Sequence, residues 1–301
     1  MAFRLLQPSV VSWPPSPIPG RRVGGLGILL VGLLLCVPSE GGAQWISSPG
    51  DGWLDVSLIY HDTDQVFDET GERRTIFAQG RAVALSLFFV GNMGIWDGVD
   101  LWAEVPVHRI RFDDAGGQRT SMGVGDSRLF VRVGPELVGL PPFPLALRGG
   151  VKMAGGSFDI DAEVIPLGEG QRDLELILEA GRSFHPRSLW TMGWVGHRWR
   201  EENVVANRTP GNEWFWWWSI GGELGPVGWE GSVEGLRGDP WVLEGGLRLP
   251  STRRQLDQIL AQVNHPLGPG HGQLGVRVPL SGQNLPAGLA ITLGYFLQWQ
   301  R

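Results

Sequence analysis

The 301-residue chain has a single cysteine and few charged residues, which make up 19% of the total. The cysteine, Cys36, lies in an N-terminal segment that we expect to be removed. The mature chain would then have no disulfide, no thiol nucleophile and no thiolate metal site. The six histidines are scattered, without the spacing of a metal-binding or catalytic pair. The sequence therefore predicts no catalytic residue, no metal and no cofactor.

No apolar run after residue 43 is long enough for a membrane-spanning helix. Residues 1–43 have the three-part pattern of a secretory signal peptide. A basic pair, Arg21-Arg22, precedes the apolar run 23–37, and small residues end the segment at Ala43. A twin-arginine signal and a lipoprotein signal fit less well, because the residues after the arginine pair and before the cysteine do not match them. We predict that residues 1–43 are a cleaved signal peptide and that 44–301 form one domain.

The mature chain is acidic. Cleavage lowers the number of basic residues from 25 to 22 and the number of acidic residues from 31 to 30, so the net charge becomes −8. Nucleic-acid binding needs a basic face, and this balance argues against it.

Glycine and tryptophan are abundant, with 46 Gly and 15 Trp. Tryptophan suits a bilayer interface, where one end of the ring is apolar and the other is wet. Polar and apolar residues alternate along much of the chain, most clearly in residues 173–180, where leucines share one face and acidic residues share the other. This alternation is typical of a closed transmembrane barrel. A tryptophan-rich soluble sandwich or lectin-like domain is the alternative.

About twelve segments have this pattern and a length that crosses a bilayer when tilted. They lie near 52–60, 75–89, 98–110, 123–136, 143–154, 171–184, 189–200, 212–224, 226–236, 241–250, 271–280 and 287–299. The sequence thus predicts an all-β fold, a transmembrane antiparallel β-barrel of about 12 strands, with both termini in the periplasm and the long polar loops outside. The stretch 251–270 breaks this rule. Its apolar residues have helical spacing, which leaves a short helix, a lumen plug or an error of two strands as alternatives.

The last segment, 292–299, alternates strictly. Thr292 is followed by Gly294, and then by apolar Leu297 and aromatic Trp299, three and five residues after the glycine. This arrangement resembles the C-terminal signal strand by which the bacterial barrel assembly machinery recognises its substrates. We therefore expect an outer-membrane protein whose partners are the lipid bilayer, lipopolysaccharide, the assembly machinery and a small-molecule substrate.

Taking the apolar side of each strand as lipid-facing assigns a set of inward residues that includes Asp126, Phe130, Glu223, Arg248 and Arg277. Twelve further members, eleven charged residues and one tryptophan, are the main lumen candidates. They are Arg128, Arg132, Arg148, Lys152, Asp173, Glu175, Glu179, Glu213, Trp217, Glu230, Glu234 and Glu244. Their chain order predicts a basic arc that faces an acidic arc. Two interpretations remain open: ion pairs that fill a narrow interior, or a transverse field that orients a polar solute. Trp217, together with Phe215, either packs a crowded lumen or forms an aromatic step for a ligand.

Three motifs, in this order, resemble the outer-membrane transporter family named for the MetA pathway of phenol degradation. They are Gly123-Val-Gly-Asp-Ser-Arg-Leu129, Gly149-Gly-Val-Lys-Met153 and Pro166-Leu-Gly-Glu-Gly-Gln-Arg-Asp-Leu-Glu175. The resemblance covers roughly residues 50–299. It implies a monomeric outer-membrane barrel that passes small hydrophobic or aromatic compounds and has no catalytic residues. We predict a passive channel or transporter. A structural or assembly barrel with a packed lumen is the alternative, and a rim enzyme that acts on lipids is a third candidate.

Overall fold

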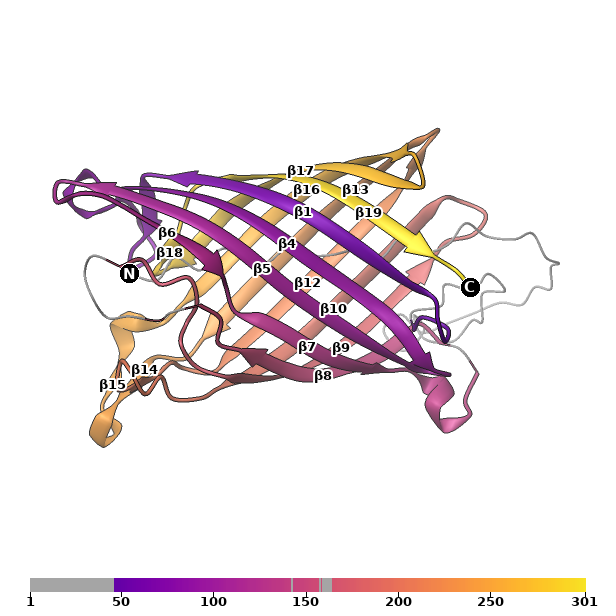
Figure 1. The fold of residues 1–301 in the computed structure, drawn as a ribbon, viewed down its shortest axis with the longest axis horizontal. Coiled ribbons are helices and arrows are strands. Elements are labelled where there is room, and N and C mark those ends of the chain that lie inside the picture. The colour runs from indigo at the N-terminus through magenta and orange to yellow at the C-terminus, as the bar shows by residue number, and fades with distance from the viewer. Residues whose placement is uncertain (1–45, 142, 157, 159–163) are drawn as a thin grey trace, which may run out of the picture.

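The computed structural model describes residues 46–301, except for residue 142, residue 157 and residues 159–163. The expected signal peptide lies outside these residues. The described chain forms one closed antiparallel β-barrel of twelve strands (Figure 1). This confirms the all-β fold and the strand number predicted from the sequence. Within the described residues, no helix is long and apolar enough to cross a membrane.

The wall of the barrel follows the chain order, and apart from β6 and β7 each strand pairs with the wall strands before and after it. Its strands are β1 (Gly52–Thr63), β4 (Arg81–Trp96), β5 (Val99–Asp114), β6 (Gly117–Val124), β7 (Ser127–Val133), β8 (Leu145–Met153), β9 (Asp173–Ser183), β10 (Leu189–Arg200), β12 (Glu213–Leu224), β13 (Val227–Gly238), β16 (Gln255–Leu267), β17 (Gly270–Gln283) and β19 (Ala290–Trp299). The barrel closes where β1 pairs with β19. Strands β6 and β7 both pair with β5, so they are two halves of one barrel strand.

Burial along the strands alternates as the sequence pattern predicts. In β9, Asp173, Glu175 and Glu179 are at most 6% exposed, whereas the leucines between them are 43–50% exposed. A single-walled barrel has only two faces, so the buried acidic side chains lie inside and the leucines lie outside. Exposed leucine on this scale would be unfavourable in water and is favourable in the hydrocarbon core of a bilayer.

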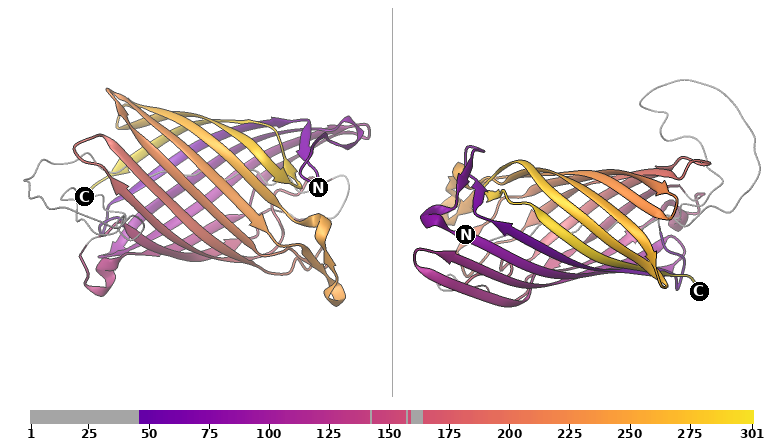
Figure 2. Two further views of the ribbon diagram at one scale, coloured as in Figure 1. Left: turned by 180° about the vertical axis from the view of Figure 1, so that it is seen from behind. Right: turned by 90° about the horizontal axis from the view of Figure 1, so that it is seen from above.

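The two ends of the barrel differ. Short turns at 97–98, 184–188, 225–226 and 268–269 join strands at one end, where the chain termini of the described part also lie. Trp299 Nε1 donates a hydrogen bond to the Gly50 carbonyl at 3.1 Å, which ties these two ends together. Long connections lie at the opposite end, where they project beyond the barrel (Figure 2).

The long connections contain two small sheets and most of the short 3-10 helices. One sheet joins β2 (Gln65–Phe67), β3 (Arg73–Thr75) and β18 (Leu285–Pro286), and the other joins β11 (Arg208–Thr209), β14 (Trp241–Leu243) and β15 (Arg248–Leu249). The 3-10 helices are η2 (Phe77–Gln79), η4 (Glu244–Gly246) and η5 (Pro250–Thr252) at this end and η3 (Pro135–Val138) at the turn end.

The strand count is right, but the tenth strand was misplaced. Residues 241–250 form β14, η4 and β15 in a long loop, and the tenth wall strand is β16. The helical interpretation of 251–270 is therefore wrong. In β16, Leu256 and Leu260 point inward while Ile259 and Val263 are exposed. Apolar residues on both faces of this strand produced a spacing that mimics a helix.

One region of the wall is incomplete. Strand β6 pairs with β5 on one side, but no described strand pairs with its other side. The described part of the 154–172 connection folds back here, and Ile165 packs against the inward-facing Ala84 and Ile110. Gly125, between β6 and β7, is required at this break, because a Cβ there would lie 2.4 Å from His108 Nε2. The long connection therefore covers the inner side of the β6 end.

Candidate functional site: the lumen

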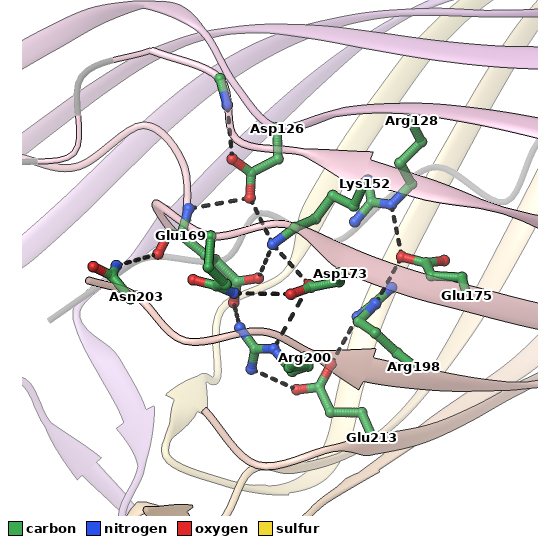
Figure 3. Close-up of polar contacts among 12 residues, drawn as sticks. Asp126, Arg128, Lys152, Glu169, Asp173, Glu175, Arg198, Arg200, Asn203 and Glu213 are labelled. Atoms are coloured by element: carbon green, nitrogen blue, oxygen red, sulfur yellow. Dashed lines mark hydrogen bonds and ion pairs between the residues drawn. The ribbon is translucent and has the colours of Figure 1, made fainter. Parts of the chain in front are cut away.

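The inward charged side chains form a dense set of ion pairs, the ionic network, on strands β5 to β12. At its loop end, Lys152 is fully buried and meets three carboxylates (Figure 3). Its Nζ lies 3.0 Å from Asp126, 2.8 Å from Glu169 and 2.8 Å from Asp173. A buried ammonium is tolerated only when it is paired. Because Lys152 is inaccessible to solvent, no aqueous path runs beside it in this form.

Deeper in the barrel, acids and arginines alternate across neighbouring strands. Glu175 accepts hydrogen bonds from Arg128 Nε at 3.2 Å and from Arg198 Nε at 2.7 Å. Arg198 also donates to Glu213 at 2.7 Å (Figure 3). Arg128 donates to Glu104 at 2.8 Å. Each of these side chains is at most 6% exposed. The chain of pairs therefore spans from β5 to β12 across the inner face.

A third group of pairs continues along β7 and β8. Arg132 contacts Asp100 and Glu179, each at 3.1 Å, and Arg148 contacts Glu179 at 2.8 Å. The Arg148 guanidinium also lies 3.4 Å from the centre of the Trp102 ring, a cation–π contact. Charged and aromatic side chains therefore pack against one another on the inner face at this level.

Glu169 links the network to the long connection between β8 and β9. Its carboxylate contacts Lys152 at 2.8 Å, Arg200 at 2.7 Å and Arg254 at 2.9 Å. The Asp126 carboxylate accepts hydrogen bonds from the backbone of Gly155 at 3.2 Å and of Glu169 at 3.1 Å. These contacts fix the described ends of the 154–172 connection inside the loop end of the barrel. We refer to the part 164–172 as the inner segment.

Aromatic rings line the rest of the lumen. Trp53 contacts Phe296 with ring centres 5.9 Å apart and Trp102 with centres 6.4 Å apart, and Trp102 stacks on Phe130 at 5.3 Å. A second group contains Trp190, Trp194 and Trp217, of which Trp194 and Trp217 stack at 6.1 Å. The lumen therefore offers ring faces as well as charges.

The structure places eleven of the twelve lumen candidates on the inner face of the barrel. Arg128, Arg132, Arg148, Lys152, Asp173, Glu175, Glu179, Glu213, Trp217 and Glu230 are all buried, and Glu234 is half-buried. Glu244 does not face the lumen: it is exposed in η4 and accepts a hydrogen bond from Asn207 at 2.6 Å. The predictions for Glu244 and for Arg248, which is exposed in β15, were wrong because they depended on the misplaced tenth strand. Glu223 was also placed in the lumen wrongly, since it is exposed near the turn end of β12.

The predicted arrangement of two opposed arcs is also wrong. The bases of β7 and β8 sit between the acids of β5 and the acids of β9, so opposite charges neutralise one another locally. The sequence interpretation missed the acids Asp100 and Glu104, which lie on β5 with inward parity. It also missed Glu169, which comes from a loop whose inward fold no strand parity predicts. The pairing matches the interpretation of ion pairs that fill a narrow interior.

A closed antiparallel wall, apolar outside and polar inside, defines a transmembrane β-barrel of the bacterial outer-membrane class. The strands of such a barrel pair their backbone groups with one another, which the hydrocarbon core of a bilayer requires.

The structure is similar to the crystal structure of the COG4313 outer membrane channel from Pseudomonas putida F1. The TM-score is 0.67 and the sequence identity is 14%, over 90% of this chain and 100% of that chain. Weaker likenesses include the translocator domain of the autotransporter NalP from Neisseria meningitidis, with a TM-score of 0.47, 8% identity and coverage of 85% and 91%. For the CymD monoaromatic hydrocarbon channel the TM-score is 0.48 and the sequence identity is 7%, over 84% of this chain and 90% of that chain. No protein-family model and no curated protein matches the chain. The first likeness establishes a shared fold, and the other two are too weak to support an argument.

Proposed function

We propose that the protein is a passive outer-membrane channel for small molecules and that the described form is its closed state. The observation that carries this proposal is the chemistry of the lumen. A barrel that served only as a scaffold would be filled most favourably by apolar side chains, because buried ion pairs add little net stability over apolar packing. A polar, charged inner face is what a water-filled path requires once it opens.

The inner segment is the element that would open. It enters the network from the long connection between β8 and β9, and Glu169 holds it through three cations. Its release would leave Lys152, Arg200 and Arg254 around a solvated mouth, and their remaining acidic partners would stay on the wall. The fold shared with a channel supports this proposal.

The substrate class that we propose is small hydrophobic or aromatic molecules. The two groups of aromatic rings in the lumen support it, because ring faces favour flat apolar solutes. The motif resemblance to the transporter family of the MetA pathway of phenol degradation points to the same class. The assembly machinery and lipopolysaccharide are further proposed partners, the first through β19 and the second through the projecting loops.

A structural barrel with a permanently packed lumen is the competing function, and the burial of the ionic network favours it. A rim enzyme is less consistent with the geometry. The Ser86 hydroxyl and His108 Nδ1 are 2.9 Å apart, but both residues are buried inside the barrel, with the Phe88 ring packed against the imidazole at 5.7 Å. A lipid in the surrounding bilayer does not reach this pair.

Liposome swelling tests the proposal. Purified, heat-modifiable protein is reconstituted into liposomes, and swelling is followed in iso-osmotic solutions of phenol-sized solutes and of larger sugars. We expect the small aromatic solutes to enter faster than they enter protein-free liposomes, while the larger sugars do not. Entry at the protein-free rate for every solute, with the barrel shown to be folded, would favour the packed structural barrel.

A further inference from the structure

A second region of the lumen, on β12, β13 and β16, carries buried polar atoms with no hydrogen-bond partner among the described residues. They include both carboxylate oxygens of Glu230, the hydroxyls of Ser219 and Ser232, and Oε1 of Gln258. None of these residues is more than 5% exposed. Most buried polar groups in native proteins have partners, so a cluster of such atoms points to a missing one.

The strand register makes this cluster contiguous. Ser219 lies opposite Ser232, and Gly221 lies opposite Glu230, on the antiparallel pair β12 and β13. Gln258 on β16 lies opposite Glu234 on β13. Directly opposite residues have Cβ atoms about 5 Å apart, and the next inward residue along a strand is roughly 7 Å away. Glu230, Ser232 and Ser219 are therefore neighbours on the inner face, and Gln258 lies farther along the same face.

Indole rings border the same site. Trp190 lies opposite Gly221 on the far side of β12, and a Cβ at Gly221 would be 2.4 Å from Trp190 Cζ2. The ring therefore covers the glycine and extends toward the Glu230 position. Trp217 lies on β12 beside Ser219, on the same inner face. Indole faces attract cations.

The charge at this site is not balanced by an ion pair in the described structure. Arg277, the nearby base, contacts Glu234 with Nε and Oε1 3.3 Å apart, and no ion pair to Glu230 is formed among the described residues. Donor atoms without a partner among the described residues, Trp217 Nε1 and Asn264 Nδ2, lie on the same strands, but both carboxylate oxygens of Glu230 call for donors. The missing partner is therefore a positively charged donor.

We propose that Glu230, Ser219, Ser232 and Trp190 form a lumen site, the Glu230 site, for a small organic ammonium ion. An –NH3+ group supplies three N–H donors, which suit the carboxylate and the two hydroxyls, and the hydrocarbon part of the ligand lies against the indole. A proton on Glu230 would satisfy only one oxygen. The Glu230 site would select organic ammonium ions among the proposed small-molecule substrates. It rests on the proposed function only in that the ligand would enter through the proposed channel.

Fluorine NMR with 4-fluorobenzylamine tests the Glu230 site on the folded protein in detergent micelles. The neutral control ligand is 4-fluorobenzyl alcohol, which has the same ring without the charge, and protein-free micelles report partitioning. We expect saturable line broadening of the amine and about tenfold or more weaker binding of the alcohol, because hydrogen bonds to charged groups are the stronger ones. Glu230→Gln should reduce amine binding to the level of the alcohol.

Glu223→Gln is the matched control, because Glu223 is an exposed acid near the turn end of β12. It should leave amine binding unchanged. Equal binding of amine and alcohol to the wild-type protein would overturn the proposal without any variant. Complete competition by potassium at the amine's own concentration would assign the site to an inorganic cation instead. Amine binding without solute entry into liposomes would refute the proposed channel alone, and solute entry without amine binding would refute the Glu230 site alone.

Discussion

Neutralising Glu169 should open the lumen. In the described form its carboxylate meets three cations at 2.7–2.9 Å and its side chain is 12% exposed. Removing one member of a buried ionic group costs about 3–5 kcal/mol, and we take the lower end, ~3 kcal/mol, because Glu169 is partly exposed. Glu169→Gln imposes this cost on the closed state alone, where the cations surround it. An equilibrium shift of ~3 kcal/mol is roughly 100-fold. A channel that is open about 1% of the time would then be open roughly half of the time.

Single-channel recording in planar bilayers measures this shift directly as open probability. Glu202→Gln is the control, because Glu202 is an exposed acid in the next long loop and its loss removes the same charge. Heat-modifiability on a gel shows that each variant is folded. Equal open probability in the wild-type protein and Glu169→Gln would refute the reasoning that the inner segment is held by charge.

Three further predictions concern the wall and its network. Replacing Leu297 and Trp299 together by Asp should lower the amount of protein in outer-membrane fractions, since two charges enter the lipid-facing side of β19; normal amounts would contradict the assembly-signal role. A fluorophore on a cysteine that replaces Leu176 should be quenched by a bilayer-restricted quencher, whereas one that replaces Glu175 should not. The reason is that the Leu176 side chain is 43% exposed on the outer face and Glu175 is 5% exposed. Equal quenching would argue against a membrane strand. Glu175→Gln should lower the free energy of unfolding by about 3 kcal/mol in urea titrations of refolded protein. The reason is that Arg128 and Arg198, both buried, lose a carboxylate acceptor. An unchanged midpoint would show that these ion pairs are solvated.

The fold could be predicted from the sequence because barrel strands carry their own signal. Each wall strand has to present apolar side chains to lipid and polar ones to the lumen, so the two-residue period appears wherever the chain crosses the membrane. The prediction failed at 241–267. There Leu256 and Leu260 point into the lumen, so β16 is apolar on both faces and its period is hidden. The loop strands β14 and β15 took its place in the prediction.

The lumen could be predicted only in part. Parity alone placed Glu175 and Lys152 on the inner face, but it says nothing about which charges meet across the barrel. That depends on strand order and on side-chain length. Glu169 could not be predicted in this way, because it reaches the network from a folded-in loop rather than from the wall. The unpartnered oxygens of Glu230 are likewise a property of packing, since the same residue type on β9 is fully paired.

The most direct test of the central claim is the conductance of the refolded wild-type protein in planar bilayers under a salt gradient, with and without small aromatic solutes. The account predicts brief discrete openings that aromatic solutes reduce. It also predicts a reversal potential that shows modest cation preference, because buried acidic side chains outnumber buried arginine and lysine side chains in the described barrel. This preference should weaken at high salt. A folded barrel that passes no current, either as the wild-type protein or as Glu169→Gln, would contradict the claim that this lumen is a path.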